Sequence, residues 1–236
     1  MILPIASNTC RECLRRPLPY VAAAAVVMAS IASQLLYRFS FGAGAPEAAN
    51  LGISAALLAG LAVAAFVGTA LVRIDLERGT LALLLSQPIG LLAYVLGRFL
   101  GLVAAICFVC ALTAASIAAA LAAVGAPSGT FSAPLFLGWL RIALAVPLLA
   151  AVALAVSAAA SRVFAPVLFL ALFLAGDVAP SSAISRVLPG FGMFGLDVGR
   201  SPSLSWLALY AGAYSGVFLV ATYLQLALRP PTRTES

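Results

Sequence analysis

The sequence contains neither lysine nor histidine, and only 8% of its 236 residues are charged. A phosphate-binding P-loop places a lysine on the nucleotide's β- and γ-phosphates, so a chain without lysine has no such loop. Histidine is the commonest general base and the commonest zinc ligand, so its absence argues against most hydrolase and zinc chemistry. The low charge also argues against a water-soluble domain, which carries about 25% charged residues.

Hydrophobic residues make up 64% of the chain, more than a water-soluble fold of this size can bury. The chain is therefore predicted to lie in a lipid bilayer. Its net charge of +6 rests on thirteen arginines. In a membrane protein, arginines in the loops fix the orientation, and this explains the charge better than a nucleic-acid partner does.

The hydrophobic residues gather in six segments, and crossing the ~30 Å hydrocarbon layer takes about 20 of them in a helix. The predicted fold class is all-α, one polytopic membrane domain over residues 1–236. Its six transmembrane helices are expected at 18–37, 51–72, 99–124, 135–160, 163–175 and 206–228. The fifth is short, and the segment 176–205 is rich in proline and glycine, which predicts a re-entrant outer segment before the sixth span.

The arginines also predict the orientation. Nine of them flank the spans on one side, whereas three lie on the other side and Arg141 just inside the fourth span. By the positive-inside rule, both termini are cytoplasmic and the protein is a multi-pass component of the cytoplasmic (inner) membrane.

The four cysteines form two C-x-x-C pairs, Cys10/Cys13 before the first span and Cys107/Cys110 within the third. The first pair is expected to be cytoplasmic and reduced. The second lies in an apolar span, where cysteine behaves as a small hydrophobic residue. With no histidine to complete a ligand set, we predict no metal site and no cofactor.

Small residues recur at every fourth position of the second span and form G-x-x-x-G pairs elsewhere. Such faces let helices approach closely in lipid. The second span is predicted to be a packing ridge, and the other pairs are weaker signals because alanine and glycine are abundant. The ridge is Gly52, Ala56, Gly60, Ala64 and Gly68, and the pairs are Gly97/Gly101 and Gly212/Gly216.

Polar residues within the spans are costly in lipid and are candidates for function. Arg141 is close enough to the outer surface to extend its guanidinium to the interface, and an outer-leaflet ion pair with Asp177 is the alternative. The other polar residues either line a path or hydrogen-bond to neighbouring backbone. They are Gln34, Thr113, Ser116, Ser157 and Gln225.

The stretch 73–101 between the second and third spans is strongly patterned. Asp75, Glu77 and Arg78 are expected to keep its start in water. A short apolar helix follows, which Thr80 can cap and Pro88 must end. Composition alone leaves two readings, a loop helix whose leucines touch lipid or a helix that binds a partner.

Two further residues follow this short helix, Tyr94 and Arg98. They are expected to anchor the start of the third span at the lipid headgroups.

This stretch resembles the ABC-2 type permeases, the membrane-spanning subunits of ATP-driven transporters. Within them it is most similar to the branch with nitrous-oxide-reductase maturation and gliding-motility permeases. Residues 5–16 also resemble the family's amphipathic elbow helix. The matching residues of the stretch are Glu77, Gly79, Thr80, Leu81, Leu84, Leu85, Ser86, Pro88, Ile89, Tyr94, Leu96, Gly97, Arg98, Phe99, Leu100 and Gly101.

The resemblance implies a mechanism. The short helix would be a cytoplasmic coupling helix that docks into a separate ABC ATPase, and two permease copies would form a homo- or heterodimer. The ATPase-coupling residues would be Glu77, Arg78, Gly79, Thr80, Leu81, Leu84, Leu85, Ser86 and Pro88. Many relatives have Ser/Thr-Arg after the Pro-Ile, where this chain has Gly90 and Leu91.

Two other functions are alternatives to an ABC-2 permease. A haem-exporter-type permease has a similar length and number of spans, but its pattern at this point has Asp-Gly. An intramembrane enzyme needs paired carboxylates, histidines or a serine with a base, and the spans contain no such set. The sequence does not identify the substrate.

Overall fold

The structure is a computed structural model that describes residues 2–16, 45–77, 90–123, 133–178 and 203–228, together with Pro189 and Phe194. Regular secondary structure in these ranges is helical throughout, which confirms the all-α prediction. The predicted first span and most of the predicted re-entrant segment lie outside the described residues. The described helices are α1 (Ile2–Arg15), α3 (Ala45–Val63), η1 (Ala64–Gly68), α4 (Thr69–Glu77), α6 (Leu91–Ala123), α7 (Ala133–Ala159), α8 (Phe164–Val178) and α9 (Leu204–Ala227).

Four helices in the described part of the chain are long and apolar enough to cross a membrane. They correspond to the second, third, fourth and sixth predicted spans. The fifth predicted span is α8, whose 15 residues extend about 22 Å, less than the hydrocarbon layer requires. The four stretches are Ile53–Glu77, Leu91–Ser116, Phe136–Ala159 and Leu204–Ala227.

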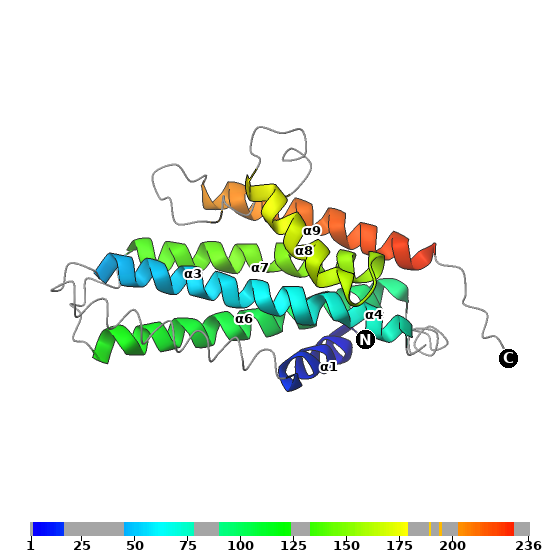
Figure 1. The fold of residues 1–236 in the computed structure, drawn as a ribbon, viewed down its shortest axis with the longest axis horizontal. Helices are drawn as coiled ribbons and strands as arrows, with labels where there is room; N and C mark the ends of the chain where they lie inside the picture. The colour runs from blue at the N-terminus through cyan, green and yellow to red at the C-terminus, as the bar shows by residue number, and fades with distance from the viewer. Residues whose placement is uncertain are drawn as a thin grey trace.

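The long helices lie side by side, and α7 contacts the α3–η1–α4 rod, α6, α8 and α9. Figure 1 shows α1 against α6 at one end of this bundle, the end at which α4 finishes and α9 also ends. The segments on either side of the predicted coupling helix therefore meet α1 at the same end of the molecule.

The predicted packing ridge on the second span is confirmed at four positions. Ala56 and Ala64 are fully buried. A Cβ at Gly60 would lie 3.3 Å from Ile106, and one at Gly68 would lie 2.9 Å from Leu102. Since α6 occupies the space of the missing side chains, glycine is what permits the close approach of the two helices.

The start of the third span differs from the prediction. Helix α6 begins at Leu91 and has 33 residues, a length of about 50 Å. The predicted span began at residue 99 because Arg98 interrupts the apolar run. In the structure Arg98 is paired with carboxylates, so its charge does not end the helix.

Candidate functional site

The predicted coupling residues are only partly described. Glu77 is the last residue of α4, and its carboxylate forms an exposed salt bridge of 3.0 Å with Arg73 one turn earlier. The remaining predicted coupling residues, Arg78 to Pro88, lie outside the described residues. What the structure does describe is how the chain is held immediately before and after them.

A buried group of charged and polar side chains connects those two ends. We call Glu12, Asp75, Tyr94 and Arg98 the ionic cluster. The Arg98 guanidinium contacts the Glu12 carboxylate on α1 at 2.8 Å (Nη1 to Oε2) and also pairs with the Asp75 carboxylate on α4. The Tyr94 hydroxyl donates a hydrogen bond to the same Asp75 oxygen, and the guanidinium lies 5.7 Å from the Tyr94 ring centroid. One arginine thus links α1, α4 and α6.

This burial corrects two expectations. Asp75 was expected in water, and Tyr94 and Arg98 at the headgroups, yet the exposed fractions are 7% for Asp75, 2% for Tyr94 and 7% for Arg98. A single buried charge would be very unfavourable, but an arginine between two carboxylates with a tyrosine donor is compensated. The partners come from three separate helices, so the sequence pattern did not reveal the pairing.

Helix α1 packs against α6 at two glycines. A Cβ on Gly97 would lie 2.6 Å from Ile5, and a Cβ on Gly101 would lie 2.5 Å from Thr9 and 2.6 Å from the backbone oxygen of Ala6. The G-x-x-x-G pair at these positions, a weak signal in the sequence, is therefore the groove that holds α1. The other pair, Gly212/Gly216, has no neighbour within 4 Å of either added Cβ.

The environment of α1 changes the acidity of two of its side chains. Burial alone would raise the pKa of Glu12, but hydrogen bonds and charge from Arg98, and then from Arg16, hold that pKa below its usual range. Burial, helped by the charge of Glu12, raises the pKa of the Cys13 thiol to about 12. Glu12 is therefore ionised and Cys13 is protonated at neutral pH.

The helix that leads into the coupling segment contains a π-helical turn, η1, directly before α4. The Thr69 hydroxyl donates a hydrogen bond to the carbonyl oxygen of Ala65 on the preceding turn. About one turn before the end of α4, the Ser157 hydroxyl of α7 accepts hydrogen bonds from the backbone N–H groups of Val72 and Arg73. Such π-turns occur frequently at functional sites. Ser157 is thus a polar residue that satisfies neighbouring backbone, one of the two roles anticipated for it.

The other predicted polar residues are placed as follows. Thr113 and Ser116 donate hydrogen bonds to carbonyl oxygens of their own helix. Arg141 on α7 is buried in the bundle, with an exposed fraction of 7%, and its extension to the membrane interface stays a prediction. Asp177 belongs to α8, but its side chain lies outside the described part, and the Arg141–Asp177 pair stays a prediction.

The cysteines are free thiols, and within the described part of the chain no three Cys, Asp or Glu side chains are placed to share a metal ion. The described residues at this end of the bundle thus hold helices together and balance buried charges. They form a buried ion pair network, a glycine groove that holds a surface helix, and a helix with a π-turn.

Comparison with protein families identifies a relationship. Residues 18–209, most of the chain, match the model of a family described as ABC-2 family transporter protein. None of the curated proteins compared with the chain matches it.

Proposed function

Since this chain belongs to the ABC-2 family of transporter proteins, we propose that it is the membrane permease subunit of an ABC-type transporter driven by a separate ATPase. The absence of lysine supports the separate motor, because a P-loop in this chain would lack its phosphate-binding side chain. The substrate is unidentified. The similarity to nitrous-oxide-reductase maturation permeases suggests a sulfur- or copper-related cargo by analogy alone.

The observation that carries the coupling proposal is the position of the ionic cluster around the segment 78–89. Asp75 lies three residues before this segment, and Tyr94 and Arg98 follow it within nine residues. Because Arg98 pairs with Asp75, the two ends of the segment are fixed to each other across the bundle. A partner that binds the segment would therefore move α4 and α6 as one unit.

The same cluster extends the proposal to α1. Arg98 pairs with Glu12 as well, so a displacement of α4 and α6 is passed to the N-terminal helix. Two permease copies in the cytoplasmic membrane, each with its N- and C-termini in the cytoplasm, complete the proposed transporter. In this arrangement the coupling helix, the ionic cluster and α1 all lie on the side of the ATPase.

The experiment compares two leucine-to-aspartate variants in co-purification with the ABC ATPase encoded nearest to this chain. Leu84→Asp would bury an unpaired carboxylate in the contact with the ATPase, which costs several kcal/mol and releases a micromolar to nanomolar partner. Leu228→Asp is the matched control, since Leu228 follows α9 at the same end of the bundle and is 80% exposed. We expect loss of the ATPase with Leu84→Asp alone.

Undiminished recovery of the ATPase with Leu84→Asp would show that this segment is not the docking element. Release by both variants would assign the effect to the added negative charge rather than to the coupling helix. In each case, insertion and the oligomeric state of the permease are checked by size-exclusion chromatography.

A further inference from the structure

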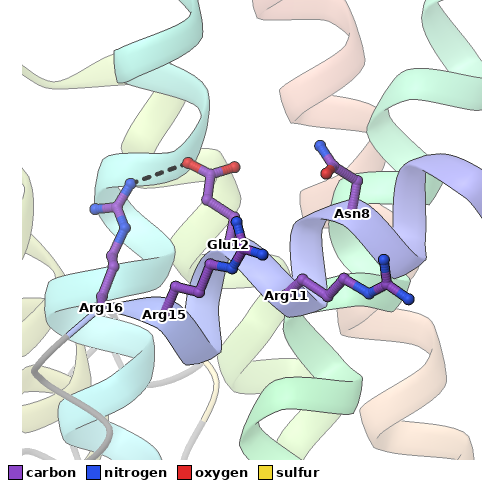
Figure 2. Close-up of a pocket in the computed structure, with 5 residues that line it drawn as sticks. All are labelled: Asn8, Arg11, Glu12, Arg15 and Arg16. Carbon is purple, nitrogen blue, oxygen red and sulfur yellow. Dashed lines mark hydrogen bonds and ion pairs between the residues drawn. The ribbon is translucent and has the colours of Figure 1, made fainter.

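One face of α1 carries positive charge that the ionic cluster does not use. A shallow pocket of about 460 Å³ is lined by Asn8, Arg11, Glu12, Arg15 and Arg16. Figure 2 shows the side chains of Arg11 and Arg15 extending from the helix, whereas Arg16 points toward Glu12. The Arg16–Glu12 salt bridge is 3.2 Å long.

The charges in this pocket are not balanced. The carboxylate of Glu12 is already shared by Arg98 and Arg16. Among the described residues, neither Arg11 nor Arg15 forms an ion pair, and both are exposed. Two guanidinium groups and the Asn8 amide therefore present hydrogen-bond donors to whatever lies outside α1.

The position of α1 on α6 indicates what lies there. Gly97 and Gly101 hold α1, and the same face of α6 continues at helical spacing with Ala104 and Phe108, both exposed. An exposed phenylalanine on a membrane-length helix contacts lipid tails, so α1 lies where the apolar surface begins. The 33 residues of α6 exceed the hydrocarbon thickness by several turns, so part of α6 extends beyond the hydrocarbon layer.

Helix α1 carries an exposed apolar residue as well as the arginines: Leu3, in its first turn, is 83% exposed. Exposed apolar and basic residues together on one amphipathic helix are typical of helices that lie in the membrane interface. This combination favours lipid over protein as the occupant.

We propose that Asn8, Arg11 and Arg15 bind the phosphate group of an anionic phospholipid in the leaflet that borders α1. A guanidinium forms two parallel hydrogen bonds with a phosphate, and the amide supplies a third donor. The bound lipid would neutralise Arg11 and Arg15, which form no ion pair within the described part of the chain. It would also hold α1 against α6 from the membrane side, while Arg98 holds it from within.

The test measures lipid retained by the full-length protein. The protein is extracted in detergent from vesicles of phosphatidylglycerol and phosphatidylcholine in equal amounts, and the retained lipids are quantified by mass spectrometry. We expect phosphatidylglycerol to be enriched on the unmodified protein. Arg11→Gln and Arg15→Gln should each lower that enrichment about fivefold, the effect of one basic residue at an anionic surface.

The matched control is Arg162→Gln, which removes the same charge from the exposed turn between α7 and α8 and should leave the enrichment unchanged. Arg15→Lys keeps the charge and should retain most of the enrichment, so a folding defect in the glutamine variants does not decide the result. Inorganic phosphate, at the ionic strength of a chloride control, should displace no more lipid than chloride does.

Equal enrichment in Arg11→Gln, Arg15→Gln and Arg162→Gln would overturn the proposal. Displacement of the lipid by inorganic phosphate would assign the pocket to a free anion instead. Unchanged lipid retention together with loss of the co-purified ATPase from Arg11→Gln and Arg15→Gln would assign this face to the protein partner.

Discussion

The hydroxyl of Ser157 on α7 accepts a hydrogen bond of 3.1 Å from the backbone N–H of Val72 on α4. The same oxygen accepts a second bond from the next backbone N–H, so one serine is attached to the turn that follows the π-helix. Residues 72 and 157 are far apart in the chain, and their contact fixes α4 to the most buried helix of the bundle.

Ser157→Ala should lower the stability of the bundle because it removes the acceptor of one buried and one part-buried backbone N–H group. The expected loss is about 1–3 kcal/mol. The fraction of protein that stays monodisperse after heating in detergent measures it. Ser215→Ala is the control, since its hydroxyl donates only to a carbonyl of its own helix and should cost less. If both variants lost the same fraction of monodisperse protein on heating, the hydrogen bonds to Ser157 would stabilise the bundle no more than the one within α9 does.

Gly101→Val should displace α1 from α6. Its Cβ would lie 2.6 Å from a backbone oxygen of α1, which cannot rotate away as a side chain could. The rate of Cys13 alkylation reports the displacement, because this thiol is buried and its pKa is raised to about 12 while α1 is docked. With the other cysteines replaced by serine, we expect the rate to rise about tenfold or more.

The control for that experiment is Gly216→Val, since nothing lies within 4 Å of a Cβ added at Gly216. Cys13 should stay protected in this variant. Continued protection of Cys13 in Gly101→Val would mean that the groove tolerates a side chain and that the glycine pair does not determine the docking.

Acidification should loosen α1 through Glu12. The pKa of Glu12 is held below its usual range, so the carboxylate stabilises docking fully above the pKa of an unfolded glutamate, about 4.3. That contribution is lost as the pH falls through the lowered pKa of the folded state. Spin labels at Asn8→Cys and Leu92→Cys, both exposed positions, should report a wider distance distribution at the acidic end.

Glu12→Gln should broaden that distribution already at neutral pH and should reduce its response to acid. The charged groups paired with Glu12 are Arg16 on α1 and Arg98 on α6, with Asp75 on the far side of Arg98. Arg11 and Arg15 line the same pocket as Glu12. An unchanged acid response in Glu12→Gln would show that the Glu12 carboxylate does not control the docking of α1.

The orientation predicted from the arginines is tested by labelling from outside the cell. On a cysteine-free background, Gly190→Cys should react with a membrane-impermeant maleimide, whereas Ser236→Cys should react only after the membrane is permeabilised. The physical reason is that arginine-rich loops stay on the cytoplasmic side. The reverse pattern would invert the proposed topology and, with it, the side on which an ATPase could bind.

The fold class could be predicted from the sequence because the hydrophobicity of a segment does not depend on its tertiary contacts. A run of apolar residues long enough to cross the hydrocarbon must be a helix, whatever its neighbours are, since lipid offers no partner to an open backbone. The positions of four membrane-length helices and the short α8 were predicted on this basis. The packing ridge at Gly60 and Gly68 was predicted from the spacing of small residues instead.

The ionic cluster was decided only by the tertiary structure. Asp75 and Arg98 were expected at the surface because burying a single unpaired charge is unfavourable. The sequence analysis made no prediction for Glu12. Their burial depends on α1, α4 and α6 bringing opposite charges within contact, a cooperative effect that residue-by-residue hydropathy does not contain. Likewise, Gly97/Gly101 and Gly212/Gly216 are the same motif in the sequence, and only the packing of α1 against α6 makes the first pair a groove and leaves the second open.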